Sequence, residues 1–383
     1  MAVLLLCGHF ATSRQAVKPL TAAEYHRFSA WLAERRLHAR DLLRRDLGEL
    51  IDGISGIKIA ADRIKSLLQR SRDLERAQEA WARDGIWVIG IDDTEFPQRL
   101  LARLSTAVSP LLFGAGGRQR LNQGGVCIIG SRDSDDGGLA FARRLGQRAG
   151  SDGLTVISSD MRGVDREAIS ATLEAGGRVI SVLSDSLIKA VAAKRNRAAL
   201  GDGSMTLLTP FSPDTRFTVA NAMRANKYQY ALSDAAVVVE TRRSGGIWSG
   251  AEENRTEDWV PGFVRAGERM SHGNLALQHL GYWPITLADV ETTGDLGAFF
   301  MRHRNQAPAK MSSPSAATAA PDLYDLFLPS LVALLQGDPL STEIVGQHFR
   351  LETVQAQAWL DRAVAEGHVK TLQDPTRYLA VIP

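Results

Sequence analysis

Between residues 126 and 264, short and largely apolar runs alternate with segments of helical periodicity, and this alternation limits the fold more than any other feature. The runs occupy 126–129, 154–157, 179–183, 205–208, 235–239 and 262–264. A strand that is apolar on both faces must be covered on both faces, as in a parallel sheet enclosed by helices. The sequence therefore predicts an α/β fold with a Rossmann-like parallel sheet. A further apolar run at 86–91 indicates one more strand.

Helical patterns precede this block, over residues 20–80. Thr21 followed by Glu24 has the spacing of a capping box, which predicts a helix beginning there. Residues 47–64 carry glycines at 53 and 56 between two short helical segments. That arrangement resembles a helix-hairpin-helix (SAM-like) module, which offers backbone N–H groups to DNA phosphates. Plain helical packing is the alternative interpretation.

The C-terminal part is separated from the block by residues 301–321, an Ala-, Ser- and Pro-rich stretch that we interpret as a linker. Three helical patterns follow, at 326–335, 341–348 and 351–366, and then two strand patterns at 369–372 and 377–382. Three helices and a hairpin predict a winged-helix domain over 322–383. Because this domain has four basic and eight acidic residues, we expect it to contact protein rather than duplex DNA.

Length and composition narrow the class of protein. A chain of 383 residues is expected to form several domains, here an N-terminal helical domain (1–80), the Rossmann-like domain (81–300), the linker and the winged helix. The net charge of +2 excludes a global positive field, so any nucleic-acid binding must be local. No stretch is long enough to span a membrane, and the apolar start lacks the basic lead of a signal peptide. We therefore expect a cytoplasmic protein.

The two cysteines, Cys7 and Cys127, form no CxxC pair, and the sequence has no HExxH. We accordingly expect no metal site. The sequence has neither a GxGxxG fingerprint nor a phosphate-binding P-loop. We expect no bound cofactor.

Ligands of open parallel sheets bind beyond the carboxyl ends of the strands, and two loops there are rich in possible anion contacts. In the loop that follows 126–129, Gly130 admits close approach, Ser131 and free N–H groups can donate, and Arg132 can bind a phosphate. The loop that follows 154–157 brings Arg162 and Gly163, with Asp165 as a possible helix cap.

Two later segments add further candidates. We expect Arg224, Asn226 and Lys227 near a helix start, where the helix dipole favours an anion. The neighbouring Tyr228 and Tyr230 either stack on bases or pack in the core. Residues 244–252 form a glycine-rich loop that leads into a helix, either as part of the same binding site or as a tight turn without a ligand.

In chain order, these segments resemble the DNA-processing protein A family (DprA/Smf). The family's strand-GSR element is similar to 127–132, and its SGxAxGID element to 158–165, with Ser159 in place of a glycine. Its RNRIIAGLS element is similar to 225–233, where Ala225 replaces the first arginine and Arg224 precedes it.

Four shorter elements complete the resemblance, which covers about residues 85–280. The family's SGSxxTA loop is similar to 244–251, and its late GxN turn to 272–274. Its DxxYP and PxxLF elements are similar to 93–97 and 110–114.

The resemblance implies a homodimeric single-stranded DNA-binding protein that protects the strand and helps to load the RecA recombinase. We therefore expect a binding protein rather than an enzyme. Together with the loop compositions, it indicates the DNA or phosphate contacts Gly130, Ser131, Arg132, Arg162, Gly163, Arg224, Asn226, Lys227, Ser244, Gly245, Gly246 and Asn274.

Two other functions remain open from the sequence. A related superfamily branch cleaves nucleotides at the glycosidic bond through a PGGxGTxxE loop, to which 244–252 is loosely similar, with Glu252 and Arg162 as possible partners. The chain could instead be a sensor that binds a free nucleotide in a defence system.

Overall fold

The computed structural model describes residues 1–10, 17–43, 54–267, 269–303, 323–349, 351–372 and 376–381. The chain divides into two compact units, Met1–Lys310 and Met311–Pro383. Most of the expected linker, the glycine at 53 and residues 373–375, between the two expected hairpin strands, lie outside the described residues.

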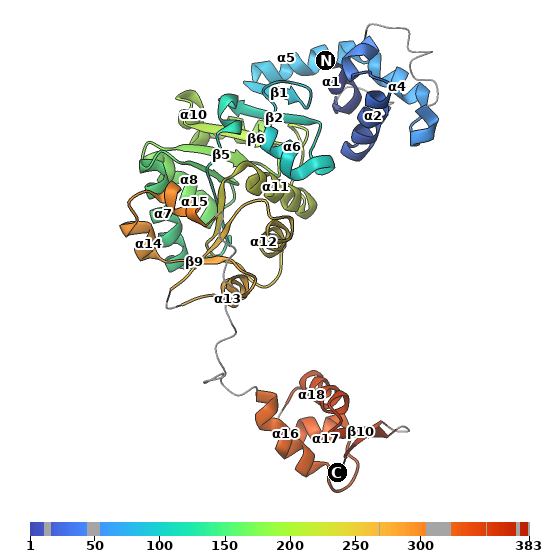
Figure 1. Ribbon diagram of the computed structural model, residues 1–383, viewed down its shortest axis with the longest axis vertical. Helices are drawn as coiled ribbons and strands as arrows, with labels where there is room; N and C mark the ends of the chain where they lie inside the picture. Colours follow the sequence, from blue (N-terminus) through green and yellow to red (C-terminus); the bar gives the residue numbers. More distant parts are fainter. Residues whose placement is uncertain are drawn as a thin grey trace. The chain divides into compact units, whose positions relative to one another are not determined.

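A nine-stranded sheet forms the centre of the first unit, in the order β1-β2-β6-β5-β4-β3-β7-β8-β9 (Figure 1). Neighbouring strands from β6 to β9 run parallel, as the apolar runs predict. The strands are β1 (Ile86–Gly90), β2 (Leu111–Gly116), β3 (Val126–Ile129), β4 (Thr155–Ser158), β5 (Arg178–Val182), β6 (Met205–Thr209), β7 (Ala235–Val238), β8 (Gly262–Arg265) and β9 (Trp283–Ile285).

One edge of the sheet departs from the prediction, because β2 pairs antiparallel with both β1 and β6. The sequence indicated a strand at 86–91 but neither its partner nor its direction. The indole N–H of Trp87 donates to the carbonyl of Gly116 at 2.8 Å, across the β1–β2 pair. Contacts of this kind join residues far apart in the chain, so local periodicity does not reveal them.

Helices cover both faces of the sheet (Figure 1). Helices α7 and α8 pack with the apolar residues of one core, and α11, α12 and α13 with those of the other. The helices of this part are α6 (Gln98–Leu104), α7 (Asp136–Ser151), α8 (Val164–Glu174), α9 (Leu187–Ala192), α10 (Lys194–Gly201), α11 (Val219–Leu232), α12 (Gly246–Glu257), α13 (His272–His279), α14 (Leu287–Thr292) and α15 (Leu296–Arg302), with short 3₁₀ turns η3 (Ser105–Ala107) and η4 (Arg118–Asn122).

The N-terminal helices belong to the same compact unit. The expected capping box is confirmed at the start of α2: the Thr21 hydroxyl accepts from the Glu24 N–H, and the Glu24 carboxylate accepts from the Thr21 N–H. These elements are α1 (Ala2–Cys7), α2 (Ala22–Glu34), η1 (Ala39–Leu43), η2 (Ile54–Ile57), α4 (Ala61–Leu68) and α5 (Ser71–Arg83).

The second unit has its own apolar core around Leu331, Leu360 and Tyr378. Its elements are α16 (Leu323–Leu334), α17 (Thr342–Phe349), α18 (Thr353–Ala365) and an antiparallel pair, β10 (Val369–Leu372) with β11 (Arg377–Ala380). Among the described residues of the whole chain, no helix combines the length and hydropathy that a membrane span requires.

Candidate functional site

The order of the parallel strands creates a crevice between β3 and β7. From β3 the chain moves outward through β4, β5 and β6, and it then returns to place β7 on the other side of β3. The loops that leave β3 and β7 therefore diverge at their carboxyl ends, which is where ligands of open α/β sheets bind.

A pocket of about 370 Å³ lies at this point, and we call it the switch-point pocket. It brings together segments that are more than a hundred residues apart in the chain. Its lining includes the following residues that the sequence predicted: Gly130, Ser131, Arg132, Asn226, Ser244, Gly245 and Gly246.

The turn after β3 offers fewer free N–H groups than expected. The Gly130 N–H donates to Asp165 Oδ1 at 3.2 Å, and the Ser131 N–H donates to the carbonyl of Glu240 at 3.0 Å. The expectation of free N–H groups is therefore wrong at these two positions, where the bonds hold the turn against α8 and against the segment that follows β7. Arg132 is the available group: its guanidinium lies 5.2 Å from the ring centre of Phe217, and it has no ion pair among the described residues.

Gly163 shapes the site through its backbone. Its φ of +84° is a left-handed conformation, and a Cβ atom there would lie 2.5 Å from the carbonyl oxygen of Ser131. Only glycine allows the turn before α8 to approach the turn after β3 this closely. The neighbouring Arg162 side chain is exposed, pairs with Asp133 at 2.5 Å and lines an adjacent pocket instead.

Asp165 is not the cap of α8, because its carboxyl group points to the turn after β3. It accepts hydrogen bonds from the Gly130 N–H and from the Ser159 hydroxyl. Complete burial raises the pKa of Asp165 to about 7, although the bonds from Ser159 and Gly130 and the charge of Arg132 act in the opposite direction. The floor of the pocket therefore holds an acid that titrates near neutral pH.

Arg224, Asn226 and Lys227 are not at a helix start, since α11 begins at Val219. The dipole-based expectation for them is therefore wrong. Asn226 reaches the pocket and its Nδ2 donates to the carbonyl of Gly246 at 3.0 Å, so it holds the glycine-rich loop in place.

The two cations of this segment lie elsewhere. Lys227 pairs with Glu253 of α12 at 2.5 Å, and Arg224 lies 5.1 Å from the ring of Phe211 in another hollow. Neither lines the switch-point pocket. Tyr228 and Tyr230 are buried, which supports the packing interpretation over base stacking.

The glycine-rich loop brings the start of α12 into the pocket. The first intrahelical bond runs from the Ser249 N–H to the carbonyl of Gly245, so the N–H groups of the three preceding residues have no helical partner. Gly245 has no side chain with which to cap them. This helix start therefore remains available to an anion.

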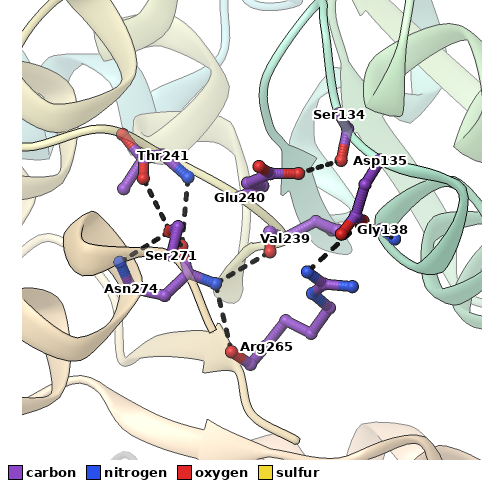
Figure 2. Close-up of polar contacts among 9 residues, drawn as sticks. All are labelled: Ser134, Asp135, Gly138, Val239, Glu240, Thr241, Arg265, Ser271 and Asn274. Atoms are coloured by element: carbon purple, nitrogen blue, oxygen red, sulfur yellow. Dashed lines mark hydrogen bonds and ion pairs between the residues drawn. The ribbon is translucent and has the colours of Figure 1, made fainter. Parts of the chain in front are cut away.

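Asn274 holds the loop after β7 through hydrogen bonds to its backbone. Its buried side chain accepts from the Thr241 N–H at 3.0 Å and donates to the carbonyls of Val239 and Arg265 at 2.9 and 3.1 Å. Figure 2 shows this network beside the Ser134–Glu240 bond and the Asp135–Arg265 pair. Asn274 does not line the pocket and acts by fixing the loop.

Sequence reasoning missed several lining residues. Arg242, in the loop that follows β7, lines the pocket without an ion pair among the described residues. Phe217 and Met223 line it and remain 42% exposed each. A position after an apolar strand could have indicated Arg242, whereas no local pattern indicates that Phe217 faces Arg132.

The groups considered for glycosidic cleavage are not brought together. Glu252 is exposed on α12 and does not line the switch-point pocket, and Arg162 pairs with Asp133. Among the described residues there is also no cluster of three or more His, Cys, Asp or Glu that could hold a metal ion.

Comparison with known families decides the relationship of the chain. A family model described as DNA recombination-mediator protein A matches residues 87–281, just over half of the sequence. The chain belongs to this family. The resemblance to the DNA-processing protein A family is thus confirmed, over almost the range expected.

Two curated relatives are similar to this chain over different lengths. Protein Smf of Synechocystis is 27% identical over 224 residues, covering 56% of this chain and 55% of that protein. Protein Smf of Escherichia coli is 29% identical over 163 residues, covering 42% and 43%. The chain thus spans about half the length of the curated relatives it matches.

A solved structure supports the fold. DNA processing protein A from Streptococcus pneumoniae aligns with a TM-score of 0.57 and 21% identity, covering 72% of this chain and 93% of that one.

Proposed function

We propose that the chain binds single-stranded DNA at the switch-point pocket, with a backbone phosphate at the start of α12 and a neighbouring base against Phe217. The observation that carries the proposal is the meeting of three features in one pocket: an uncapped helix start, two unpaired arginines and an exposed aromatic ring. Membership of a DNA recombination-mediator family supports the same ligand class.

The anion contacts come from three chain segments. The free N–H groups at Gly246 and Ile247 favour negative charge, and the guanidinium groups of Arg132 and Arg242 can donate to phosphate oxygens. No ion pair within the described residues competes for these two arginines.

The base contact rests on the wall formed by Phe217, Val219 and Met223, whose side chains line the pocket and stay exposed. An aromatic ring stacks on any base, with about 1–3 kcal/mol for each base. Arg132 above the Phe217 ring can bridge the base and the phosphate contacts.

Family resemblance supports the finer parts of the proposal. We propose a cytoplasmic homodimer that protects single strands and helps to load RecA. We also propose that 1–80 is a helical domain, that 81–300 is the DNA-binding domain, and that 322–383, after the linker, is a winged helix. The acidic excess of that last domain supports a protein partner.

Binding of fluorescent oligo(dT) at increasing salt tests the proposal. Arg132→Ala and Arg242→Ala should each weaken binding about tenfold for all sequences alike, and should lower the salt slope by about 0.7. Arg243→Ala is the matched control, because Arg243 is exposed and does not line the pocket. Equal losses in all three variants would oppose the proposal.

The base contact has a separate test. Phe217→Ala should weaken binding to oligo(dT) but not to an abasic strand of the same length, and Phe217→Trp should restore it. A mutation that weakens both ligands equally would indicate only a structural role for Phe217.

A second candidate is binding of a free nucleotide, because a volume of about 370 Å³ is of the size that a small ligand fills. Tight binding of a mononucleotide by a chain that has no measurable affinity for oligo(dT) would favour this sensor function.

A further inference from the structure

A second pocket of about 410 Å³ lies beside the first, at the carboxyl ends of β4 and β5. It is lined by the loops after these strands and by α8, α9 and α10. Its charged lining residues are Arg132, Arg162, Arg166, Lys189, Arg195, Asp160 and Asp185. Cations therefore outnumber carboxylates there.

The carboxylate of Asp160 cannot neutralise this excess. It is 9% exposed and pairs with two arginines at once, Arg195 and, at 3.7 Å, Arg166. The side chains of both remain about half exposed. Lys189 has no ion pair among the described residues. The pocket thus keeps positive charge that faces solvent.

The two pockets form one groove. Arg132, Ser159, Met161 and Ser184 line both of them. Because the sheet order is β5-β4-β3-β7, their centres are about two strand spacings apart, roughly 10 Å. A single extended ligand can therefore occupy both within a few nucleotides.

The lining chemistry distinguishes the two pockets. The first pocket has the exposed ring of Phe217, whereas no aromatic side chain lines the second among the described residues. The second pocket can therefore hold the charged backbone of a strand but has no surface on which a base would stack.

We infer that the strand proposed for the switch-point pocket continues across the ends of β4 and β5, where Lys189 and Arg195 contact its backbone phosphates. This inference rests on the proposed function. It assigns the strand a direction across the sheet edge, from β7 and β3 toward β5.

The test uses the full chain and an oligo(dT) of about twenty nucleotides, longer than the sites of many single-strand binders. Lys189→Ala and Arg195→Ala together should weaken binding about tenfold or more and lower the salt slope by about 1.4, since each lost phosphate contact accounts for about 0.7. Lys194→Ala with Arg197→Ala is the matched control, because these exposed cations are on α10 and do not line the pocket.

Asp160→Asn provides a change in the opposite direction. Removing this carboxylate frees Arg166 and Arg195, so binding of the same oligo(dT) should become tighter, which a damaged fold would not produce. Circular dichroism and urea unfolding check the fold of each variant.

The outcomes separate the two proposals. If Arg132→Ala weakens binding while the Lys189/Arg195 variant keeps the wild-type affinity and slope, the continuation is overturned and the first pocket stands. If the wild-type chain does not bind oligo(dT), both are overturned.

Discussion

At the scale of single residues, Asp165 connects the protonation of a buried carboxyl to the charge of the binding site. With a pKa of about 7, it is largely neutral at pH 6 and largely charged at pH 8. Its charged form adds negative charge to the lining of the switch-point pocket, where we propose that a phosphate binds.

We therefore predict that oligo(dT) binding weakens several-fold between pH 6 and pH 8, and that Asp165→Asn removes most of this dependence. No histidine lines either pocket among the described residues, so histidine protonation does not produce the same profile there. Fluorescence anisotropy at constant salt measures it. A wild-type affinity that does not change with pH would contradict the prediction.

The same acid affects folding. Because the folded-state pKa of Asp165 is raised, this residue contributes to the free energy of unfolding below the ordinary carboxyl pKa. That contribution is lost as pH rises through about 7. As pH rises from the ordinary carboxyl pKa to about 7, the free energy of unfolding of Asp165→Asn should accordingly decline less than that of the wild type.

Gly163 gives a prediction about backbone geometry. Gly163→Ala combines a positive φ with a Cβ placed against the Ser131 carbonyl, and should lower the free energy of unfolding by about 3 kcal/mol. Gly176→Ala is the matched control, since its φ is +73° but nothing lies within 4 Å of the added Cβ. There we expect about 1 kcal/mol. Equal losses in urea unfolding would show that the close approach of the two turns is unimportant.

At the scale of an element, α2 is held at its first turn by a clamp that joins local and distant contacts. Glu24 completes the capping box and also pairs with Arg63 of α4 at 2.7 Å. The hydrogen bond from Arg63, together with those from Thr21, lowers the pKa of Glu24 to about 2.

Since this folded-state pKa is depressed, the clamp contributes fully above the ordinary carboxyl pKa and is lost as pH falls toward 2. We predict that Glu24→Gln lowers the free energy of unfolding at pH 7 by about 1 kcal/mol, because solvent screens the pair, and by less at pH 3. Chemical unfolding at both values measures the difference. A loss of equal size at pH 3 would indicate that the side chain contributes by packing and not by its charge.

At the scale of the whole molecule, the apolar cores separate the two units. The two cores around the sheet contain residues up to Phe300, and the third contains residues from Tyr324 onward. Both pockets are lined only by residues of the first unit.

We predict that a fragment of residues 1–303 unfolds cooperatively and binds oligo(dT) within about twofold of the full chain. Urea unfolding and anisotropy test the two parts of this prediction. A large loss of affinity in a fragment that still unfolds cooperatively would show that the C-terminal unit contributes to binding.

The sequence by itself determined what depends on neighbours within a few residues. The apolar run at 126–129 became a parallel strand, Thr21 and Glu24 formed the capping box, and the glycines at 245 and 246 led into a helix, because periodicity and capping are local. The start of α11 was not determined in this way: the sequence indicated a helix start near Arg224, whereas the helix begins at Val219.

Only the tertiary structure decided which charges remain free. Lys227 meets Glu253 through a contact that spans 26 residues, whereas Arg132 and Arg242 face the pocket. It also decided that β2 joins the sheet antiparallel and that Phe217 lies beside Arg132. Ion pairs and ring contacts of this kind depend on where distant segments come together in space, and no local spacing of residues encodes that.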